Sequence, residues 1–435
     1  MAAAFKGIVR RRVSDVISAR LKEEPVVAVQ GPRTVGKSTV VRQIASDHDV
    51  GVFDLDDRAT RDAIRADTAT YAASTPPVCF DEYQKAPEIL EAIKAELNLN
   101  LTSGRYLLAG STTQDALPEL AESLTGRMHT VELFPFSQGE IRGHREDIVE
   151  RLFDSPEKLV ASATSSKSDT KRAEYIELIV AGGFPLALSR QGPARGRWFD
   201  DYIRQTLERD VRELSRIRQR DQLRRLLERL AGQTAQLLNT ANTSRALNMD
   251  ASTAENYTKL LEAVYLIHRL PAWGKTLRSR AVATPKVHML DSGLAARLLR
   301  LTPEKLARLE PTSQQQFGHL LETFVVNELI KQSSWIDGVV GRGHWRTHDG
   351  NEVDLVLERE DGAIVAFEVK ARGRVSRSDF SGLRILRTAV GDAFLAGAVL
   401  YLGEHAYTHD DRLHALPVDR IWTPLPLSPQ ASNVQ

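Results

Sequence analysis

Residues 31–39, GPRTVGKST, combine glycines, a lysine and hydroxyl side chains at a spacing suited to holding phosphate groups. The stretch fits the pattern G-x-x-x-x-G-K-[ST] and lies between an apolar run, PVVAVQ, and a helical stretch, STVVRQIA. This context argues against a chance glycine-rich turn. The glycines would let backbone N–H groups turn toward phosphate oxygens, and the lysine would place its charge beside the β- and γ-phosphates. We therefore predict a site for ATP, with Mg²⁺ on the Ser38 hydroxyl, formed by Gly31, Pro32, Arg33, Thr34, Val35, Gly36, Lys37, Ser38 and Thr39.

Two adjacent carboxylates, Asp81 and Glu82, end the apolar run PPVCFDE. Next to a phosphate-binding loop, Asp81 would lie near the Mg²⁺ and Glu82 near the water that attacks the γ-phosphate. The pair therefore predicts hydrolysis of ATP rather than binding alone. The alternative is a pair of surface carboxylates at the end of a strand.

Two further positions could assist hydrolysis. The run RYLLAGSTT ends in Ser111, Thr112 and Thr113, where a polar side chain could orient the attacking water. Arg127, in LTGRMHTVEL, could neutralise charge that develops on the γ-phosphate of its own or a neighbouring subunit. A solvated or structural arginine is the alternative for this position.

A second set of reactive residues lies in GNEVDLVLEREDGAIVAFEVKA, residues 350–371. Nuclease sites of the PD-(D/E)xK kind use two carboxylates to hold Mg²⁺ and a lysine to position or activate water. Asp354, Glu368 and Lys370 supply these groups, and Glu322 on the preceding helix could complete the metal shell more readily than Glu328. The alternative is an exposed sheet face that carries mixed charges.

The turn in this stretch decides whether the charges share a face. Glu368 and Lys370 are two residues apart, so they point to the same side of a strand. A two-residue turn would place Asp354 opposite Val369, pointing away from them. A three-residue loop at 360–362, with Gly362 in the left-handed region, places Asp354 opposite Glu368. The glycine favours this second register.

The elements that must carry these residues follow from apolar runs and their spacing. Between residues 25 and 135, short apolar runs alternate with helical stretches, which predicts a mostly parallel, three-layer α/β sheet. Residues 155–173 are polar and rich in Ser and Lys, which predicts a linker or mobile loop. The stretch NTSRALNMDASTAENYTKLLEAVYL, residues 242–266, reads as a short helix, a tight turn and a longer helix, with the strand signals YLIHRL at its end and PKVHML after it.

The middle of the chain offers a basic surface. Residues 269–286 contain three arginines, two lysines and Trp273 but no acid, where the wing of a winged helix would lie. On the second helix, Ser252, Thr253, Asn256 and Lys259 would face a groove. Contact with nucleic acid, DNA more than RNA, is one interpretation, and a protein-interaction module is the other. The arginines of residues 190–229 alternate with acids, which also suits a solvated helix face.

Composition narrows the class of protein. A chain of 435 residues with net charge +1 is long enough for several domains and gives no overall attraction to polyanions. No apolar run approaches the roughly 20 residues that span a membrane, and no secretory signal is visible. The single Cys79 cannot form an internal disulfide. We therefore expect a cytoplasmic protein without a membrane partner.

Together, GPRTVGKST, CFDEYQKAP, LLAGSTT, YIRQTLERDVREL, PKVHMLDSGLAARLL, GHLLETFVVNEL and the 350–371 stretch resemble a family of bacterial and archaeal AAA-type ATPases. The resemblance implies a P-loop core, a winged-helix module and a C-terminal domain similar to PD-(D/E)xK nucleases. Its nucleotide site would fall on residues 31–39, Asp81 and Glu82, and its nuclease-like positions on Glu322, Asp354, Glu368 and Lys370. The expected divisions are an ATPase core at 1–150, a linker and helical region at 151–238, a winged helix at 239–300, a nuclease-like domain at 310–425 and a disordered tail at 426–435.

The sequence as a whole predicts a Mg²⁺-dependent ATPase whose cycle is coupled to nucleic-acid engagement. The C-terminal unit would be a metal-binding, nuclease-like domain, and a homo-oligomer is a possible assembly. The alternative is a nucleotide-switched regulatory or interaction protein that cleaves nothing.

Overall fold

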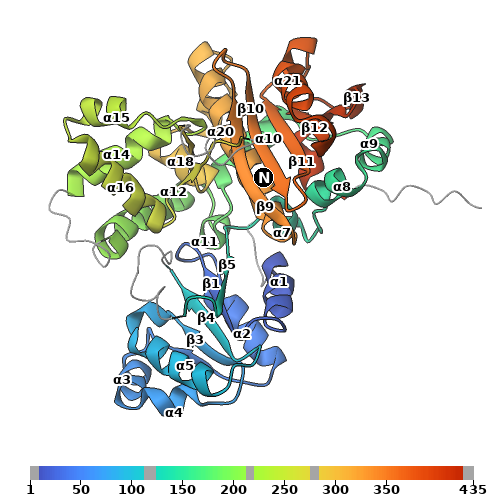
Figure 1. The fold of residues 1–435 in the computed structure, drawn as a ribbon. Coiled ribbons are helices and arrows are strands. Elements are labelled where there is room, and N and C mark those ends of the chain that lie inside the picture. The colour runs from blue at the N-terminus through green and yellow to red at the C-terminus, as the bar shows by residue number, and fades with distance from the viewer. Residues whose placement is uncertain (1–8, 112–123, 212–219, 275–283, 425–435) are drawn as a thin grey trace, which may run out of the picture.

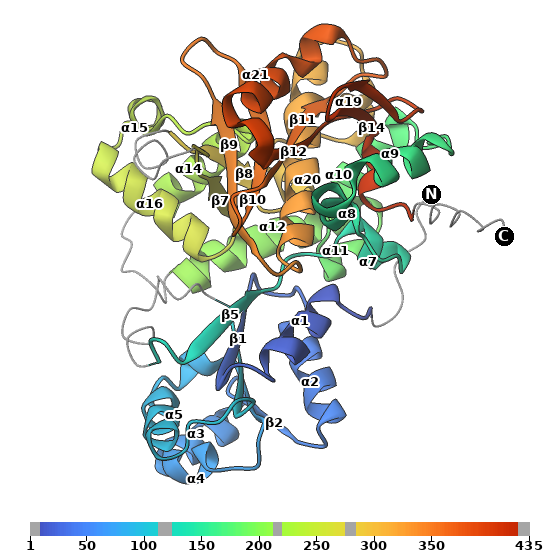
Figure 2. The ribbon, with the colours of Figure 1, turned by 45° about the vertical axis from the view of Figure 1, so that its right-hand side comes forward.

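The computed structural model describes residues 9–111, 124–211, 220–274 and 284–424, which form two lobes (Figure 1). The first sheet and its helices make the lower lobe in Figures 1 and 2, and the later elements make the upper lobe. Within these ranges, no helix combines the length and the apolar character needed to cross a membrane.

The N-terminal lobe contains a five-stranded sheet in the order β2-β3-β4-β1-β5, and all neighbouring strands are parallel. Its strands are β1 (Val26–Gln30), β2 (Val52–Asp54), β3 (Val78–Asp81), β4 (Tyr106–Gly110) and β5 (Met128–Glu132). Its helices are α1 (Arg12–Arg20), α2 (Lys37–Asp47), α3 (Arg58–Ala66), α4 (Thr68–Ala72) and α5 (Glu88–Leu99), with a 3₁₀ turn η1 (Tyr83–Lys85).

Alternation along the strands builds the three layers of this lobe. Val27 and Val29 of β1 pack in one apolar cluster with residues of α1 and α2, whereas Val26 and Ala28 pack in a second cluster with residues of α3 and α5. Both faces of the sheet are therefore covered, which is why its three central strands β3, β4 and β1 are buried along their whole length. The predicted parallel three-layer sheet is confirmed.

The strand order sets where polar residues meet. Strand β4 lies between β1 and β3, so three loops leave the same carboxyl edge of the sheet side by side. These are the loop after Gln30, the loop after Asp81 and the chain at Ser111. In open parallel sheets, ligands bind at this edge.

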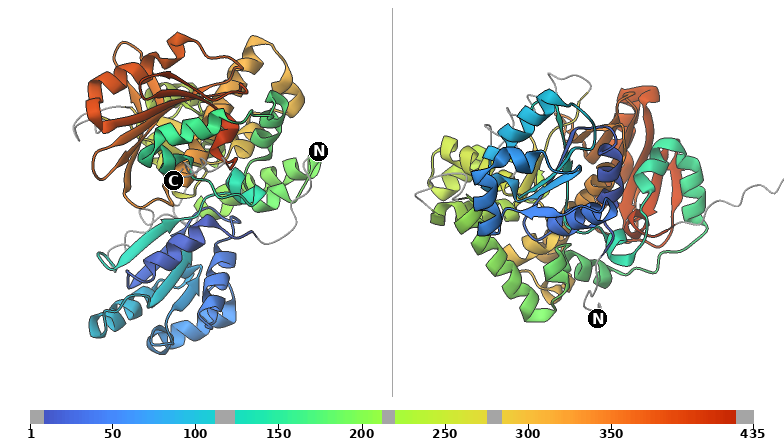
Figure 3. Two further views of the ribbon diagram at one scale, coloured as in Figure 1. Left: turned by 90° about the vertical axis from the view of Figure 1, so that its right-hand side faces the viewer. Right: turned by 90° about the horizontal axis from the view of Figure 1, so that it is seen from below.

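Several helices connect the lobes and wrap the upper one. They are α7 (Gln138–Arg142), α8 (Ile148–Asp154), α9 (Pro156–Thr164), α10 (Arg172–Ala181), α11 (Pro185–Leu188) and α12 (Gly192–Gln205), which continues into a π-helical turn η3 (Thr206–Asp210). Helix α8 contacts β11 and β12, and α9 contacts β13 and β14, all in the C-terminal sheet (Figure 3, left).

The linker predicted for residues 155–173 is wrong in its first half, where helix α9 forms. Leu159, Val160 and Ala163 of this helix are buried. The segment that follows is also attached, since the Ser168 hydroxyl donates a hydrogen bond of 2.6 Å to Asp419. A narrow apolar stripe in a Ser- and Lys-rich segment is enough to anchor a helix, although the average composition suggests a loop.

Among the described residues, the middle unit contains three helices and a small antiparallel sheet in the order β6-β8-β7. Its elements are α14 (Arg220–Gly232), β6 (Gln236–Leu237), α15 (Thr240–Leu247), α16 (Ala251–Ala263), β7 (Ile267–Leu270) and β8 (Lys286–Met289), and α18 (Ser292–Leu298) and α19 (Pro303–Ala307) follow. The predicted short helix, turn and longer helix are confirmed by α15 and α16. Asn248 turns the chain between them with a left-handed φ of 51°.

The C-terminal unit begins with the long helix α20 (Pro311–Ser333) and contains a mixed six-stranded sheet in the order β13-β14-β12-β11-β10-β9. Its strands are β9 (Val339–Arg346), β10 (Glu352–Arg359), β11 (Ile364–Lys370), β12 (Phe394–Tyr401), β13 (Tyr407–Asp410) and β14 (Leu413–Pro417). Helix α21 (Ser381–Val390) and the 3₁₀ turns η4 (Arg377–Phe380), η5 (Gly391–Ala393) and η6 (Val418–Ile421) complete it. Residues of α20 and of α21 pack in separate apolar clusters on the two faces of the sheet.

The hairpin of β10 and β11 has the predicted three-residue loop. Leu355 pairs with Phe367, and the Arg359 N–H donates a hydrogen bond of 2.9 Å to the Ala363 carbonyl. Gly362 has a φ of 80°, which is the left-handed conformation expected for it. One step further along this register, Asp354 stands opposite Glu368, as the loop length predicted.

The middle unit is attached to the outer edge of the C-terminal sheet. The Trp273 N–H donates a hydrogen bond of 2.6 Å to the His344 carbonyl, and the His344 N–H donates one of 2.9 Å to Pro271. Ala272 and His344 form a short parallel bridge. The chain after β7 thus covers part of β9, an edge strand whose backbone groups would otherwise be unpaired.

Candidate functional site

The loop after β1 has the geometry of a phosphate-binding loop. Gly36 has a φ of 102°, and a Cβ on Gly31 would lie 2.2 Å from the Leu133 carbonyl oxygen, so both positions require glycine. Lys37 begins α2 and is buried, and its ammonium donates hydrogen bonds of 2.9 Å to the carbonyls of Gly31 and Pro32. The lysine therefore lies across the loop at the N-terminus of an 11-residue helix, where a phosphate would be favoured.

Ser38 and Asp81 meet beneath this loop. The Ser38 side chain lies beside the Asp81 carboxylate, which is buried at the end of β3. Burial raises the pKa of Asp81, and the neighbouring Ser38 hydroxyl acts in the opposite direction. A hydroxyl and a carboxylate beside a phosphate-binding loop are the oxygen ligands that Mg²⁺ takes, so these residues fit Mg²⁺ with ATP.

Glu82 is held by a small hydrogen-bonded cluster. Its Oε2 accepts hydrogen bonds from Gln84 Nε2 at 2.5 Å and Ser111 Oγ at 3.2 Å. Glu82 also has a φ of 54°, a left-handed conformation that costs a residue other than glycine about 1 kcal/mol or more. The strain and the two hydrogen bonds fix the carboxylate at the sheet edge beside the loop. The sequence prediction included Ser111 but missed Gln84, although it is a polar residue two positions after the carboxylate.

Thr112 and Thr113 lie outside the described residues, and Arg127 lies away from this edge. Met128 pairs with Val26, so Arg127 precedes β5 at the amino edge of the sheet, whereas the phosphate-binding loop leaves the carboxyl edge. Its guanidinium donates a hydrogen bond of 2.7 Å to Asn98. This placement gives no support to a role at its own nucleotide site, and a role in a neighbouring subunit stays a prediction.

Arg11 contacts the phosphate-binding loop and was not predicted. Its guanidinium donates hydrogen bonds to the carbonyls of Val35 at 2.8 Å and Phe134 at 2.7 Å, and it pairs with Glu140 at 2.9 Å. No local pattern indicates this role, because Arg11 lies in a run of arginines that precedes the first strand.

The C-terminal carboxylates are brought together around a lysine of the middle unit. The Lys286 ammonium donates hydrogen bonds to Glu322 at 2.7 Å and Asp354 at 2.9 Å, and it forms an ion pair with Glu352. Burial by itself lowers the pKa of Lys286, but Asp354, Glu322 and Glu352 raise it well above its ordinary value. Sequence analysis placed Lys286 in a basic wing because its partners are distant in the chain.

Glu368 and Lys370 form a neighbouring pair. The Lys370 ammonium donates a hydrogen bond of 2.6 Å to Glu368 Oε1, while Oε2 is buried without a hydrogen-bond partner among the described residues. Burial raises the pKa of Glu368 to about 8, and the Asp354 carboxylate adds to this rise. These residues line a cavity of about 640 Å³ together with His319, Arg346 and Ser378.

This arrangement does not fit a divalent metal ion. In the part of the chain that the structure describes, no group of three or more His, Cys, Asp and Glu side chains could hold one. Asp354 has one oxygen on Lys286, and its other oxygen accepts a hydrogen bond of 2.9 Å from the Val369 N–H. Glu328 does not belong to this group of carboxylates. Its carboxylate accepts a hydrogen bond of 2.7 Å from the Gln138 N–H and forms an ion pair of 2.7 Å with Lys331.

The predicted basic surface at residues 269–286 is smaller than expected. Arg269 pairs with Glu262 at 2.7 Å and Glu255 at 2.9 Å, and Lys286 is buried as described. Both therefore have acidic partners from outside the stretch, which its own sequence could not show. Its other cations, Lys275, Arg278 and Arg280, lie outside the described residues. On α16, Ser252, Asn256 and Lys259 are exposed and Thr253 is half-buried.

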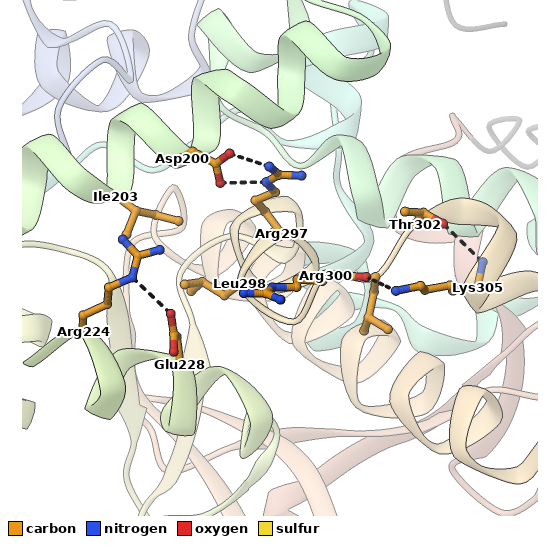
Figure 4. A pocket seen from close by; sticks show the side chains of 10 residues that line it. Asp200, Ile203, Arg224, Glu228, Arg297, Leu298, Arg300, Thr302 and Lys305 are labelled. Carbon is orange, nitrogen blue, oxygen red and sulfur yellow. Dashed lines mark hydrogen bonds and ion pairs between the residues drawn. The ribbon is translucent and has the colours of Figure 1, made fainter. Parts of the chain in front are cut away.

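A further cavity of about 530 Å³ lies among α12, α14 and the segment from α18 to α19 (Figure 4). Four of its charged side chains form two pairs, Arg297 with Asp200 at 2.8 Å and Arg224 with Glu228 at 3.1 Å, and the Lys305 ammonium donates a hydrogen bond of 2.9 Å to the Arg300 carbonyl. The two ion pairs are exposed to solvent, and we assign the cavity no role.

The parallel sheet, the glycine loop and the Ser38–Asp81 pair define the N-terminal lobe as a P-loop nucleotide-binding domain. More particularly, residues 23–142 match the model of an AAA domain, so this lobe is of the AAA type. Residues 172–305 match a domain of unknown function, DUF8612, and residues 317–421 match another, DUF4143. The three matches follow one another along the chain.

Relatives match along most of the chain. The uncharacterised protein Rv2008c of Mycobacterium tuberculosis is 27% identical over 418 residues, covering 96% of this chain and 85% of its own. Among solved structures, the Walker-type ATPase PABY2304 of Pyrococcus abyssi is 16% identical with a TM-score of 0.39, covering 67% of this chain and 95% of its own. The RuvB Holliday junction branch migration motor of Thermotoga maritima is 17% identical with a TM-score of 0.29, covering 60% and 90%. TM-scores of this size do not establish a common overall fold.

Proposed function

We propose that the protein is a Mg²⁺-dependent ATP hydrolase whose reaction takes place at the carboxyl edge of the N-terminal sheet. The observation that carries this proposal is the juxtaposition of two pairs: Ser38 with Asp81 beneath the loop, and Glu82 with Ser111 beside it. A nucleotide-binding protein without hydrolysis would have no need for a strained carboxylate held at this place.

Each residue has a distinct task in this proposal. The loop N–H groups and Lys37 bind the phosphates, and Ser38 and Asp81 hold Mg²⁺, which when bound neutralises phosphate charge. Glu82 accepts a proton from the attacking water, and Ser111 and Gln84 keep its carboxylate oriented. The buried position of Asp81 limits its motion, so the ligand oxygens are fixed before nucleotide arrives.

Two variants test this proposal. Lys37→Ala should lose tight ATP binding, whereas Glu82→Gln should retain binding and lower kcat about a hundredfold or more, because only the proton acceptor is removed. The matched control is Glu91→Gln, which changes an exposed carboxylate of α5. Turnover in Glu82→Gln equal to that of the wild type would refute the role of Glu82.

Nucleic-acid engagement is the second part of the proposal, with DNA preferred to RNA. It rests on α16, the second helix of a helix–turn–helix, which exposes Ser252, Asn256 and Lys259 on one side. DNA should stimulate ATP hydrolysis in the wild type, and Ser252→Glu with Lys259→Glu should remove that stimulation while leaving basal hydrolysis unchanged. Stimulation that survives these two substitutions would exclude α16 as the contact surface.

A nucleotide-switched interaction protein that cleaves nothing is the alternative. The ion pairs of Lys286 favour it over a metal-dependent nuclease, because they occupy the carboxylates that such an enzyme would need. Purified protein with ATP and either Mg²⁺ or Mn²⁺ should therefore leave DNA and RNA intact. Cytoplasmic location and homo-oligomeric assembly stay predictions.

A further inference from the structure

Three carboxylates from two elements converge on one buried point in the C-terminal unit. Glu322 comes from α20, and Glu352 and Asp354 come from β10. Carboxylates that lie close enough to contact one cation repel one another strongly when they are removed from water. Such a cluster therefore needs a cation. The cation in this structure is the ammonium of Lys286, which reaches all three carboxylates from β8.

We propose that this carboxylate cluster is a socket for Lys286, which takes the place that a divalent ion would occupy, and that the full chain holds no divalent ion there. An ammonium has three N–H donors, and here three carboxylates surround it. The lysine is 1% exposed, so water does not satisfy these donors instead. The cluster is thereby a permanent ionic contact between the middle and C-terminal units.

The strand that carries Lys286 is itself fixed. Strand β8 is central in the small sheet and pairs with both β6 and β7. The segment that follows β7 is hydrogen-bonded to the edge of the C-terminal sheet through Trp273 and His344. The backbone at Lys286 is therefore held against the C-terminal unit, so the ammonium stays within reach of the three carboxylates while the two units remain together.

The remaining charges agree with this interpretation. Glu352 also pairs with Arg346 at 3.2 Å, and Glu368 pairs with Lys370. Every carboxylate in the cavity therefore has a protein cation or a backbone N–H as a partner. The alternative is that the ammonium only holds the place until a metal ion displaces it, and the experiment below distinguishes the two.

The test is the binding of Mn²⁺ to the nucleotide-free full chain. The amount bound is measured from the electron paramagnetic resonance signal of the Mn²⁺ that stays free in solution. A fragment starting near residue 310 would lack Lys286, so the whole chain is needed. The wild type and Asp354→Asn should bind the same amount of Mn²⁺. A Mn²⁺ site in the wild type that Asp354→Asn removes would overturn the proposal.

Removal of the lysine should create the site that the wild type lacks. Lys286→Met should gain one Mn²⁺ site, which the double variant Lys286→Met/Asp354→Asn should lose. Lys259→Met, which changes an exposed lysine of the same unit, should gain none. A folded Lys286→Met variant without a Mn²⁺ site would also contradict the proposal, because its carboxylates would then not form a cation site.

A second measurement decides the question if Lys286→Met does not fold. Acetylation of native wild-type protein with acetic anhydride, mapped by mass spectrometry, should modify Lys259 at least tenfold faster than Lys286, because only the former is exposed. Equal rates at the two lysines would show that the ammonium leaves its socket and would overturn the proposal. Neither measurement depends on ATP hydrolysis, so failure here is distinguishable from failure of the proposed function.

Discussion

At the scale of single residues, the Glu82 cluster shows how a catalytic carboxylate can be positioned before substrate binds. Ser111 directly follows β4, and Gln84 lies in the turn after β3. Their side chains are 3.0 Å apart, and both donate hydrogen bonds to Glu82. Two donors on one oxygen leave the other oxygen to receive a proton. The cluster depends on the strand order, because it forms only where β4 lies beside β3.

We predict that Ser111→Ala lowers kcat about tenfold without a comparable change in ATP affinity. The loss of one hydrogen bond to a charged group corresponds to about 1.5 kcal/mol, and the nucleotide contacts remain. Steady-state hydrolysis and nucleotide binding measured on the same preparation would check this. Ser103→Ala changes an exposed serine of the same lobe and should leave kcat unchanged. A Ser111→Ala enzyme with wild-type kcat would remove this serine from the mechanism.

At the scale of elements, Glu146 connects the loop before α8 to the start of α7. Its Oε1 accepts a hydrogen bond of 2.8 Å from the Gly139 N–H, and its Oε2 is buried without a hydrogen-bond partner among the described residues. Burial raises the pKa of Glu146 from 4.5 to about 7, and the nearby Glu328 and Glu140 carboxylates contribute to the rise. The connection between the two helices is thus sensitive to pH.

The direction in which stability changes with pH follows from the direction of the pKa shift. A carboxyl group whose pKa is raised on folding adds stability below its unfolded pKa and loses that contribution as the pH rises through its folded pKa. The stability that Glu146 contributes is therefore lost between about pH 4.5 and about pH 7. We predict that Glu146→Gln, which keeps the acceptor for Gly139, removes about 3 kcal/mol of pH dependence across this window.

Unfolding of wild type and Glu146→Gln at a series of pH values would measure the difference. Subtracting the unfolding free energy of the variant from that of the wild type at each pH removes the contributions of other titrating groups. Glu150→Gln provides a control at an exposed position of α8. Parallel pH profiles for the wild type and Glu146→Gln would show that Glu146 carries no such contribution.

The elements also show what periodicity in a sequence can and cannot predict. The hairpin of β10 and β11 was predictable to its register because a glycine at the third loop position and alternation along both strands act locally. Helix α9 was missed because its apolar residues are few and their burial depends on β13 and β14, which lie more than two hundred positions away in the chain. Local patterns predict elements, and distant partners decide whether a weakly patterned segment is ordered.

At the scale of the whole molecule, the grouping of residues at each of the two sites could be predicted, but the Lys286 ammonium among the C-terminal carboxylates could not. The residues that surround the phosphate-binding loop are either contiguous or at the ends of successive strands, so motif and topology together bring them to one edge. Lys286 and Asp354 are 68 positions apart and in different units, and no pattern in either segment indicates the pairing. The charge that decides the chemistry of a site can thus come from outside its motif.

Helix α20 contacts both the carboxylate socket and the link between the lobes. Near its C-terminal end, Glu328 accepts from the Gln138 N–H, and Lys331 donates a hydrogen bond of 3.0 Å to the Phe136 carbonyl. Phe136 lies between β5 and α7, and Gln138 begins α7. The buried Glu328–Lys331 pair therefore attaches the chain that leaves the nucleotide-binding sheet to α20 of the upper lobe.

We predict that breaking this pair loosens the lobes more than removing it does. Glu328→Met leaves the Lys331 ammonium buried without its carboxylate, which should cost about 3–5 kcal/mol, whereas Glu328→Met with Lys331→Met removes both charges and should cost less. Thermal unfolding and limited proteolysis between residues 132 and 148 would measure the two effects, with Glu310→Met, at the exposed start of the same helix, as the control. The single variant should be cleaved fastest and melt lowest. If the double variant is instead at least as unstable as the single one, the pair stabilises the junction as an intact hydrogen-bonding unit, and the uncompensated charge is not the dominant cost.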